Sequence, residues 1–255
     1  MMERKYKLKR TKIVATIGPS SLSKKNIRKM ILAGMNICRI NFSHCDHSDA
    51  KRIISIVTEL NLELNSHVAI LGDLQGPKLR IGEVEDKIIL KKNDKIIIQE
   101  GKLKSNKENI FINYSNISKD IAIGDKILLD DGKIILKAEY SNNEKTTCIV
   151  MQGGELKSNK GVNLPNTKIS LPTITTKDYN DLLFCIKSNI EWVALSFVRT
   201  AKDIISLKKI ISDHNGDLKV IAKIEKPEAI KNLKSIILHS DALMVARGDH
   251  GVEVP

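Results

Sequence analysis

Short apolar runs alternate with stretches of helical periodicity at both ends of this 255-residue chain, and a different pattern fills its middle. The first runs, Lys12–Ile17, Met35–Phe42 and His67–Leu71, are nearly continuous in apolar residues. Strands that are covered on both faces have this composition, which is typical of parallel sheets. Between the runs, helical spacing extends from Ser23, a predicted N-cap, to Gly34, a predicted C-cap, and from about Ser48 to Leu64. These βα units predict a parallel sheet at the start of the chain.

The pattern changes after Gly76. From about residue 83 to residue 154 the chain has short alternating segments, such as Lys95–Gln99 and Lys126–Leu129, separated by turns such as Asp131-Gly132. This pattern predicts a compact antiparallel β domain. Gly161–Pro165 is expected to be the linker that returns the chain to the first architecture.

The first rhythm resumes after Thr176. Helical stretches are predicted over 176–189 and 201–213 and from Pro227 onward, and strands over 192–198, 218–224 and 242–246. Six βα units with polar residues at their strand ends favour a barrel over an open sheet. The predicted fold is therefore α/β, a TIM-type (β/α)8 barrel of which six units are present. Its expected parts are barrel over 1–75, inserted all-β domain over 76–170, and barrel again over 171–255.

Composition excludes several classes of protein. The net charge is +12, but the lysines are spread along the whole chain, and its four Tyr and four Phe do not interleave with basic clusters. A stacking surface for nucleic acid needs such interleaving. Apolar runs all fall short of the roughly 20 residues that span a membrane, and the basic N-terminus leads into a strand rather than an export signal. With four cysteines and no CxxC pair, these features predict a cytoplasmic protein without nucleic-acid or membrane partners.

Polar side chains share one face of the second predicted strand. Arg39, Asn41 and Ser43 are spaced by two, so they project together while Ile40 and Phe42 pack on the other side. Polar groups on a buried strand are costly unless they are satisfied. Either an internal hydrogen-bonded cluster or a binding site for ions would satisfy them.

The fifth and sixth strands repeat this arrangement. Lys223 and Glu225 share a face, as an intrastrand ion pair or as part of a site, and Gly248-Asp249 follows the sixth strand. Two carboxylates with few other ligands suit Mg²⁺, and a glycine lets a ligand approach the backbone. The third strand adds Asp73 at its end and Arg80 nearby. Cations and carboxylates that converge on successive strand ends are what phosphoryl transfer requires.

Seven segments closely resemble the pyruvate kinase family in content and order: Thr11–Ser21, Gly34–His44, Gly72–Gly82, Lys160–Pro165, Leu195–Arg199, Ala222–Pro227 and Met244–Pro255. The resemblance implies phosphoryl transfer from phosphoenolpyruvate to ADP, giving pyruvate and ATP, on an eight-unit barrel with an inserted lid and a C-terminal domain. Strands seven and eight and that domain are absent from these residues, so the chain is expected to be a truncated form of the family fold. It also implies a homo-oligomer, a tetramer at full length.

The resemblance also implies roles for individual residues. Glu225 and Asp249 would hold Mg²⁺ or Mn²⁺, and Lys223 with Arg39 would be catalytic and bind substrate. The backbone of Gly248 and Asp249 would receive the substrate carboxylate. The nucleotide site would be lined by Pro19, Arg39, His44, Arg80 and Lys160.

Most members of this family need K⁺, held by residues that match Asn41, Ser43, Asp73 and the carbonyl of Leu74. Here Leu74-Gln75 and then Lys78 follow the aspartate, which resembles the K⁺-independent branch, in which a lysine ammonium replaces the cation. We therefore expect no K⁺ requirement.

One departure from the family is His250, where leucine is usual; it is expected to face solvent. Two alternatives remain open. One is a catalytically incompetent fragment that binds anions or partner chains. The other is a phosphoenolpyruvate-handling lyase on a similar barrel, against which the lid and the return segment argue.

Overall fold

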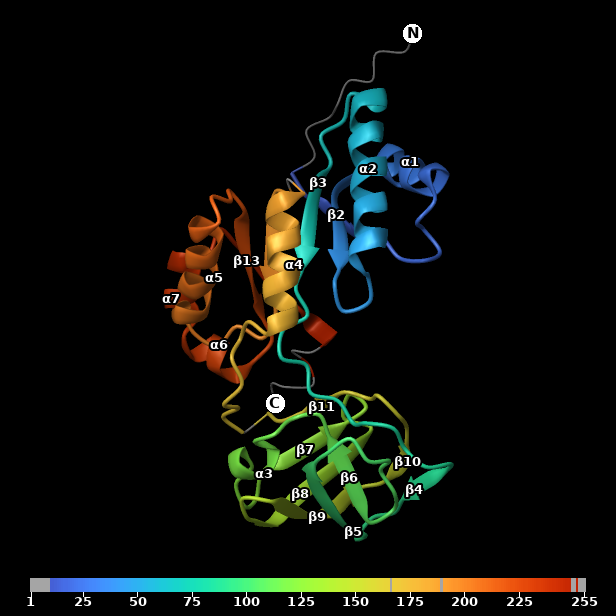
Figure 1. Ribbon diagram of the computed structural model, residues 1–255, viewed down its shortest axis with the longest axis vertical. Coiled ribbons are helices and arrows are strands. Elements are labelled where there is room, and N and C mark those ends of the chain that lie inside the picture. The colour runs from blue at the N-terminus through green and yellow to red at the C-terminus, as the bar shows by residue number, and fades with distance from the viewer. Residues whose placement is uncertain (1–9, 166, 189, 249–250, 252–255) are drawn as a thin grey trace.

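The computed structural model describes residues 10–165, 167–188, 190–248 and 251. Figure 1 shows two parts: a sheet flanked by helices, and a β-rich part below it, joined by the segment after β3 and the segment before α4. The insertion therefore begins and ends at the same end of the parallel strands.

Six parallel strands form the first part. They lie in the order β1-β2-β3-β12-β13-β14, with β1 (Ile13–Thr16), β2 (Met35–Asn41), β3 (Ala69–Asp73), β12 (Trp192–Leu195), β13 (Lys219–Ile224) and β14 (Ala242–Val245). Each pairs with the next in parallel, and β3 pairs directly with β12 across the insertion. This order confirms the predicted βα architecture, a partial TIM-type barrel.

The helices that accompany these strands in the described residues are α1 (Lys24–Ala33), α2 (His47–Leu64), α4 (Thr176–Lys187), α5 (Ala201–Asp213), α6 (Pro227–Lys231) and α7 (Leu233–His239). The caps of α1 are those that the sequence predicts. The Ser23 side chain accepts from the backbone N–H of Asn26, and Gly34 ends the helix at φ 110°. The single helix expected from Pro227 is instead two short ones that meet at Asn232.

The two faces of the parallel sheet differ. The face toward the helices belongs to one large apolar core that includes Cys38, Ile40 and Phe42 of the β2 region. Among the described residues, the opposite face has a small apolar cluster, whose buried members are Leu71, Ala194 and Ile221. Side chains of a strand point alternately to its two faces, so each strand contributes to both.

The inserted domain has a sheet in the order β11-β7-β8-β9-β5-β6 and a β10-β4 pair. Its elements are β4 (Ile88–Leu90), β5 (Lys95–Glu100), β6 (Asn109–Ile112), α3 (Ile117–Asp120), β7 (Lys126–Leu129), β8 (Ile134–Ser141), β9 (Lys145–Gln152), β10 (Gly154–Leu156) and β11 (Val162–Asn163). It has its own apolar core.

Two expectations for this domain are corrected. The β5–β6 pair is parallel, so the sheet is not wholly antiparallel. The predicted linker Gly161–Pro165 contains β11, which pairs with β7, because Val162 and Leu164 bury their side chains in the core of the domain. The return crossing therefore lies further along the chain.

Among the helices of the described residues, none combines the length and hydropathy that a bilayer crossing would need.

Candidate functional site

A charged cluster lies on the face of the parallel sheet opposite the helices, hereafter called the inner face, where β2, β3 and β13 end. Lys223 Nζ lies 3.3 Å from Asp73 Oδ1 and 3.0 Å from Glu225 Oε1. Arg39 donates from Nε to Asp73 Oδ2 at 2.7 Å and from Nη1 to Thr16 Oγ1 at 2.7 Å. Two cations thus face two carboxylates, and the predicted Lys223–Glu225 ion pair is part of a larger cluster.

The cluster is assembled from residues that share one face. Register places Asn41 beside Asp73, and Asp73 beside Ala194. Ile40 lies between Arg39 and Asn41, and Ile224 lies between Lys223 and Glu225. Both isoleucines point to the helices and belong to the apolar core. The sequence prediction that alternate residues separate into a polar and an apolar face is therefore confirmed.

Burial and charge act in opposite directions on Lys223. Burial lowers the pKa of the ammonium, but the Asp73 and Glu225 carboxylates outweigh it and hold that pKa above its ordinary value. Lys223 therefore remains a cation at neutral pH. It also donates to Ser196 Oγ at 2.7 Å, and Ser196 donates in turn to the carbonyl of Leu74 at 2.6 Å.

Glu225 is fully buried and is held in place by the backbone after β12. The N–H of Phe197 donates to Glu225 Oε2 at 2.7 Å. Phe197 has φ 55°, the left-handed region that is unfavourable for a bulky residue. Such strain persists only where surrounding contacts enforce it, and it often occurs at functional sites.

Sequence reasoning missed Ser196 and Phe197, although both lie in a segment that it singled out. A polar residue at the end of an apolar run was the available signal for Ser196. The left-handed backbone of Phe197 has no such signal, because phenylalanine rarely adopts it.

The sequence predicts that the Lys78 ammonium takes the place of a monovalent cation beside Asn41, Ser43, Asp73 and the carbonyl of Leu74. Asn41 Oδ1 accepts from the Ser43 N–H at 3.0 Å, and Leu74 is buried. Among the described residues, Lys78 forms no hydrogen bond or ion pair with Asp73, and its side chain lines a cavity instead. The charge of Asp73 is balanced by Arg39 and Lys223.

Two predicted nucleotide-binding residues belong to the inserted domain and lie together. Arg80 pairs with Gly161 in an antiparallel bridge and donates to the Asn159 carbonyl at 2.9 Å. The Lys160 ammonium lies 3.0 Å from Asp130 Oδ1. Pro19 and His44 are exposed on the loops after β1 and β2, at the same strand ends as Arg39.

Asp249 and His250 lie outside the described residues, and Gly248 is exposed after β14. No group of three or more metal-ligating side chains occurs within the described ranges. The donor chemistry nevertheless fits a hard divalent cation, because Mg²⁺ typically takes one or two carboxylates and completes its shell with water and substrate phosphate. The buried Glu225 carboxylate is one such donor.

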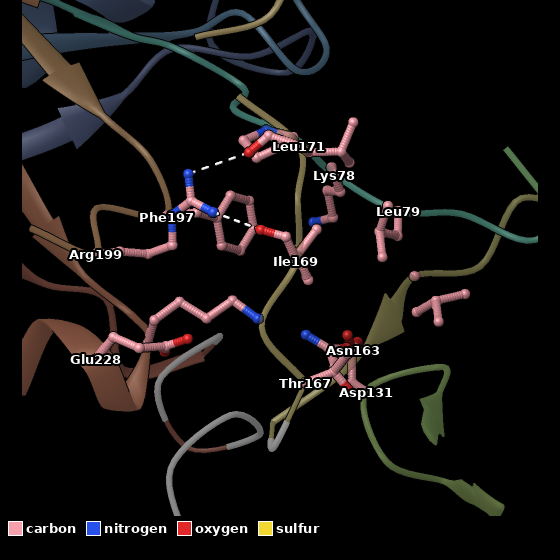
Figure 2. A pocket seen from close by; sticks show the side chains of 14 residues that line it. Lys78, Leu79, Asp131, Asn163, Thr167, Ile169, Leu171, Phe197, Arg199 and Glu228 are labelled. Carbon is pink, nitrogen blue, oxygen red and sulfur yellow. Dashed lines mark hydrogen bonds between the residues drawn. The ribbon is translucent and has the colours of Figure 1, made fainter. Parts of the chain in front are cut away.

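A small cavity of about 30 Å³ lies where the two parts of the molecule meet. Figure 2 shows Arg199 and Glu228 on one side of it and Asn163, Thr167 and Asp131 on the other. A volume of this size is large enough to hold water.

The fold and the inner-face cluster define a parallel β/α barrel protein with an inserted β domain and a charged site at its strand ends. A family model for the pyruvate kinase barrel domain matches residues 8–255. The pyruvate kinase of Staphylococcus epidermidis strain RP62A is 40% identical over 251 residues, which cover 97% of this chain and 43% of that protein. A pyruvate kinase of Staphylococcus aureus strain MRSA252 is 41% identical with the same coverage.

The chain belongs to the pyruvate kinase family. It spans 43% of the length of these curated relatives.

Proposed function

We propose that the protein containing this chain transfers a phosphoryl group from phosphoenolpyruvate to ADP with the help of a divalent cation, giving pyruvate and ATP. The observation that carries the proposal is the buried cluster in which Lys223 contacts both Asp73 and Glu225. Family membership and the pairing of two cations, Arg39 and Lys223, with two carboxylates, Asp73 and Glu225, support the same chemistry.

In the proposed reaction the bond between phosphorus and the enol oxygen breaks, and phosphorus bonds to a terminal oxygen of ADP. The enolate that remains takes up a proton to become pyruvate. Lys223, kept cationic by its two carboxylates, donates to the phosphoryl oxygens, and Arg39 adds a second positive charge. Such preorganised charge is the main source of catalysis in phosphoryl transfer.

Glu225 and Asp249 would hold Mg²⁺ or Mn²⁺, and the ion would supply Lewis-acid polarisation of the phosphate oxygens. The backbone of Gly248 and Asp249 would receive the substrate carboxylate. On the nucleotide side, Arg80 and Lys160 of the inserted domain would meet the ADP phosphates, with Arg39, Pro19 and His44 contributing from the barrel. We also propose the division of the chain into 1–75, 76–170 and 171–255, a cytoplasmic location and a homo-oligomeric state.

The experiment is a coupled assay of pyruvate formation with phosphoenolpyruvate, ADP and Mg²⁺. The chain is assayed alone and fused to the part of the S. aureus relative that it does not match. Glu225→Gln in the active form should lower kcat by about 100- to 1,000-fold, the typical cost of losing one charge-stabilising group. The control is Lys219→Gln, an exposed lysine on the same strand.

An inactive fusion that still folds and binds phosphate would contradict this function and favour the incompetent fragment. A second arm replaces KCl by choline chloride. We expect activity within about twofold, because Arg39 and Lys223 already balance the charge of Asp73. A steep K⁺ requirement would contradict the K⁺-independent assignment.

A further inference from the structure

The segment that returns the chain from the inserted domain to the barrel, residues 167–173, is hereafter called the strap. It is bonded to both parts of the molecule at neighbouring residues. On the inserted-domain side, the Ser170 N–H donates to Asp120 Oδ2 at 2.7 Å, and Ser170 Oγ lies 2.7 Å from Tyr114 Oη. Tyr114 in turn donates to Asp120. Ser170 is therefore fixed to the inserted domain.

The carbonyls on either side of Ser170 are bonded to the barrel. Arg199 donates from Nη1 to the Ile169 carbonyl at 2.8 Å and from Nη2 to the Leu171 carbonyl at 3.1 Å (Figure 2). Residues two apart in an extended segment face the same side. One guanidinium thus binds both outward carbonyls, a geometry that its rigid fork of donors allows and a lysine ammonium does not reproduce.

Arg199 is itself anchored to the barrel. Its N–H donates to Asp203 Oδ2 at 2.8 Å, and its carbonyl accepts from Asn232 Nδ2 at 3.0 Å. Its Nη2 also donates to Thr173 Oγ1 at 2.8 Å, and Thr173 donates to Asp203 Oδ1 at 2.6 Å. The strap is therefore tied to the start of α5 through a closed set of hydrogen bonds.

The segment from Ser196 to Arg199 also contacts the charged cluster. Ser196 contacts Lys223, Phe197 binds Glu225, and Arg199 follows two residues later. The backbone that positions the carboxylate of the site therefore also carries the group that binds the strap.

The first crossing between the two parts is anchored at the barrel as well. The Gly76 N–H donates to Asp178 Oδ1 at 2.9 Å, and Gly76 has φ 70°. A Cβ there would lie 2.8 Å from Phe197 Cδ2, so only glycine fits this close approach. Both crossings are thus fixed against the residues that follow β12.

We propose that Arg199 is a positioning residue that sets the angle at which the inserted domain stands over the barrel rim. By holding the strap it would keep Arg80 and Lys160 at a defined distance from Arg39 and Lys223. The consequence for catalysis rests on the proposed function, whereas the geometric effect does not.

The test measures the distance between spin labels on the two parts by pulsed electron resonance, using the chain as it stands. Labels are attached at Leu62→Cys on α2 and Ile123→Cys in the inserted domain, both exposed, in a Cys45→Ser background because the other three cysteines are buried. Arg199→Met should broaden the distance distribution at least twofold, and Arg199→Lys should broaden it less. Lys202→Met, which removes an exposed charge on the first turn of α5, is the control and should leave it unchanged.

A second variant keeps the test decisive if Arg199→Met fails to fold. Asp120→Ala with Ser170→Ala removes the acceptor of the Ser170 N–H and the Ser170 hydroxyl, breaks the other side of the strap and should broaden the distribution too. An unchanged distribution in either folded variant overturns the proposal.

Kinetics of the fused protein separate this inference from the proposed function. Arg199→Lys should raise KM for ADP about tenfold and leave kcat within about threefold, since the cluster around Lys223 is untouched. A normal KM with broadened distances would overturn the catalytic consequence. Complete inactivity of the parent fusion would overturn the proposed function, while the distance measurement would still decide the role of Arg199.

Discussion

The two faces of the six-stranded parallel sheet are built from the same strands but serve different purposes. On β13, Val220, Ala222 and Ile224 join the large apolar core under the helices. Ile221 between them lies on the inner face, followed by Lys223 and then Glu225 just beyond the strand. The helix-facing side buries more apolar side chains, and the opposite face concentrates charge at the strand ends.

The comparison teaches that charge chemistry can be placed inside a fold without interrupting its core. Side chains alternate between faces with a period of two. A strand can therefore carry Lys223 beside Ile224 with each in a suitable environment. The cost is that the buried charges must be balanced by one another, as in the ion pairs of Asp73 with Arg39 and Lys223.

The largest expected effect is that of Lys223→Met, which would show that the charged face is also needed for stability. Lys223→Met leaves Asp73 and Glu225 as buried carboxylates without their shared cation, so the free energy of unfolding at pH 7 should fall by about 3–5 kcal/mol. Urea unfolding measures this, with the exposed Lys219→Met as control. The deficit should shrink at acid pH, because protonation removes the charge of a buried carboxylate that has lost its cation. A deficit under about 1 kcal/mol would contradict the role of the ion pairs.

In the parent protein, the Lys223 ammonium makes stability depend on pH in the alkaline range. Because the folded-state pKa of Lys223 is raised, its stabilisation is complete below its ordinary value of 10.5 and is lost as the pH rises through the folded-state value. Lys223→Met should remove that alkaline loss.

The second prediction sharpens the comparison between faces. Ile40→Ala removes a fully buried side chain from the helix-facing core and should lower the free energy of unfolding by about 3 kcal/mol. The matched control is Met244→Ala on the inner face, where the side chain is only partly buried, and it should cost less than about 1 kcal/mol. Equal losses from the two variants would show that the faces do not differ in packing.

The smallest expected effect concerns Gly72, which lies beside Ile40 in the sheet. A Cβ at Gly72 would lie 2.7 Å from Cys185 Sγ and 3.1 Å from Phe42 Cε2, so Gly72→Ala should cost about 1–2 kcal/mol through overpacking. Adding Cys185→Ala removes the nearer atom. The double variant should then be more stable than the sum of the two single effects predicts. Strictly additive effects of the two substitutions would mean that the methyl group introduced by Gly72→Ala does not clash with Cys185.

Much of the fold was predictable because it depends on local patterns. The spacing of apolar residues, the Ser23 and Gly34 caps and the proline at the start of α6 all predicted elements that the structure confirms. Errors arose where tertiary contacts override local pattern. Val162 and Leu164 enter the core of the inserted domain, and the parallel pairing of β6 with β5 has no local signature.

The candidate site was predictable to a different extent. Arg39, Asp73, Lys223 and Glu225 were singled out from the faces they share and the strand ends they occupy. Their contacts were not, since Asp73 and Lys223 are 150 positions apart and meet only because β3 and β13 flank β12. Arg199 was missed as a link to the strap, because carbonyl acceptors are present in every residue and leave no pattern.

By itself the sequence determined which residues alternate between apolar and polar surroundings, because periodicity is a local property of the chain. It also determined that charged groups end several buried strands. Only the tertiary structure decided that Lys223 bridges two carboxylates, that Phe197 adopts a left-handed backbone to bind Glu225, and that Arg199 holds the strap. These are contacts between distant segments, and their geometry exists only once the sheet has curled and brought the strand ends together.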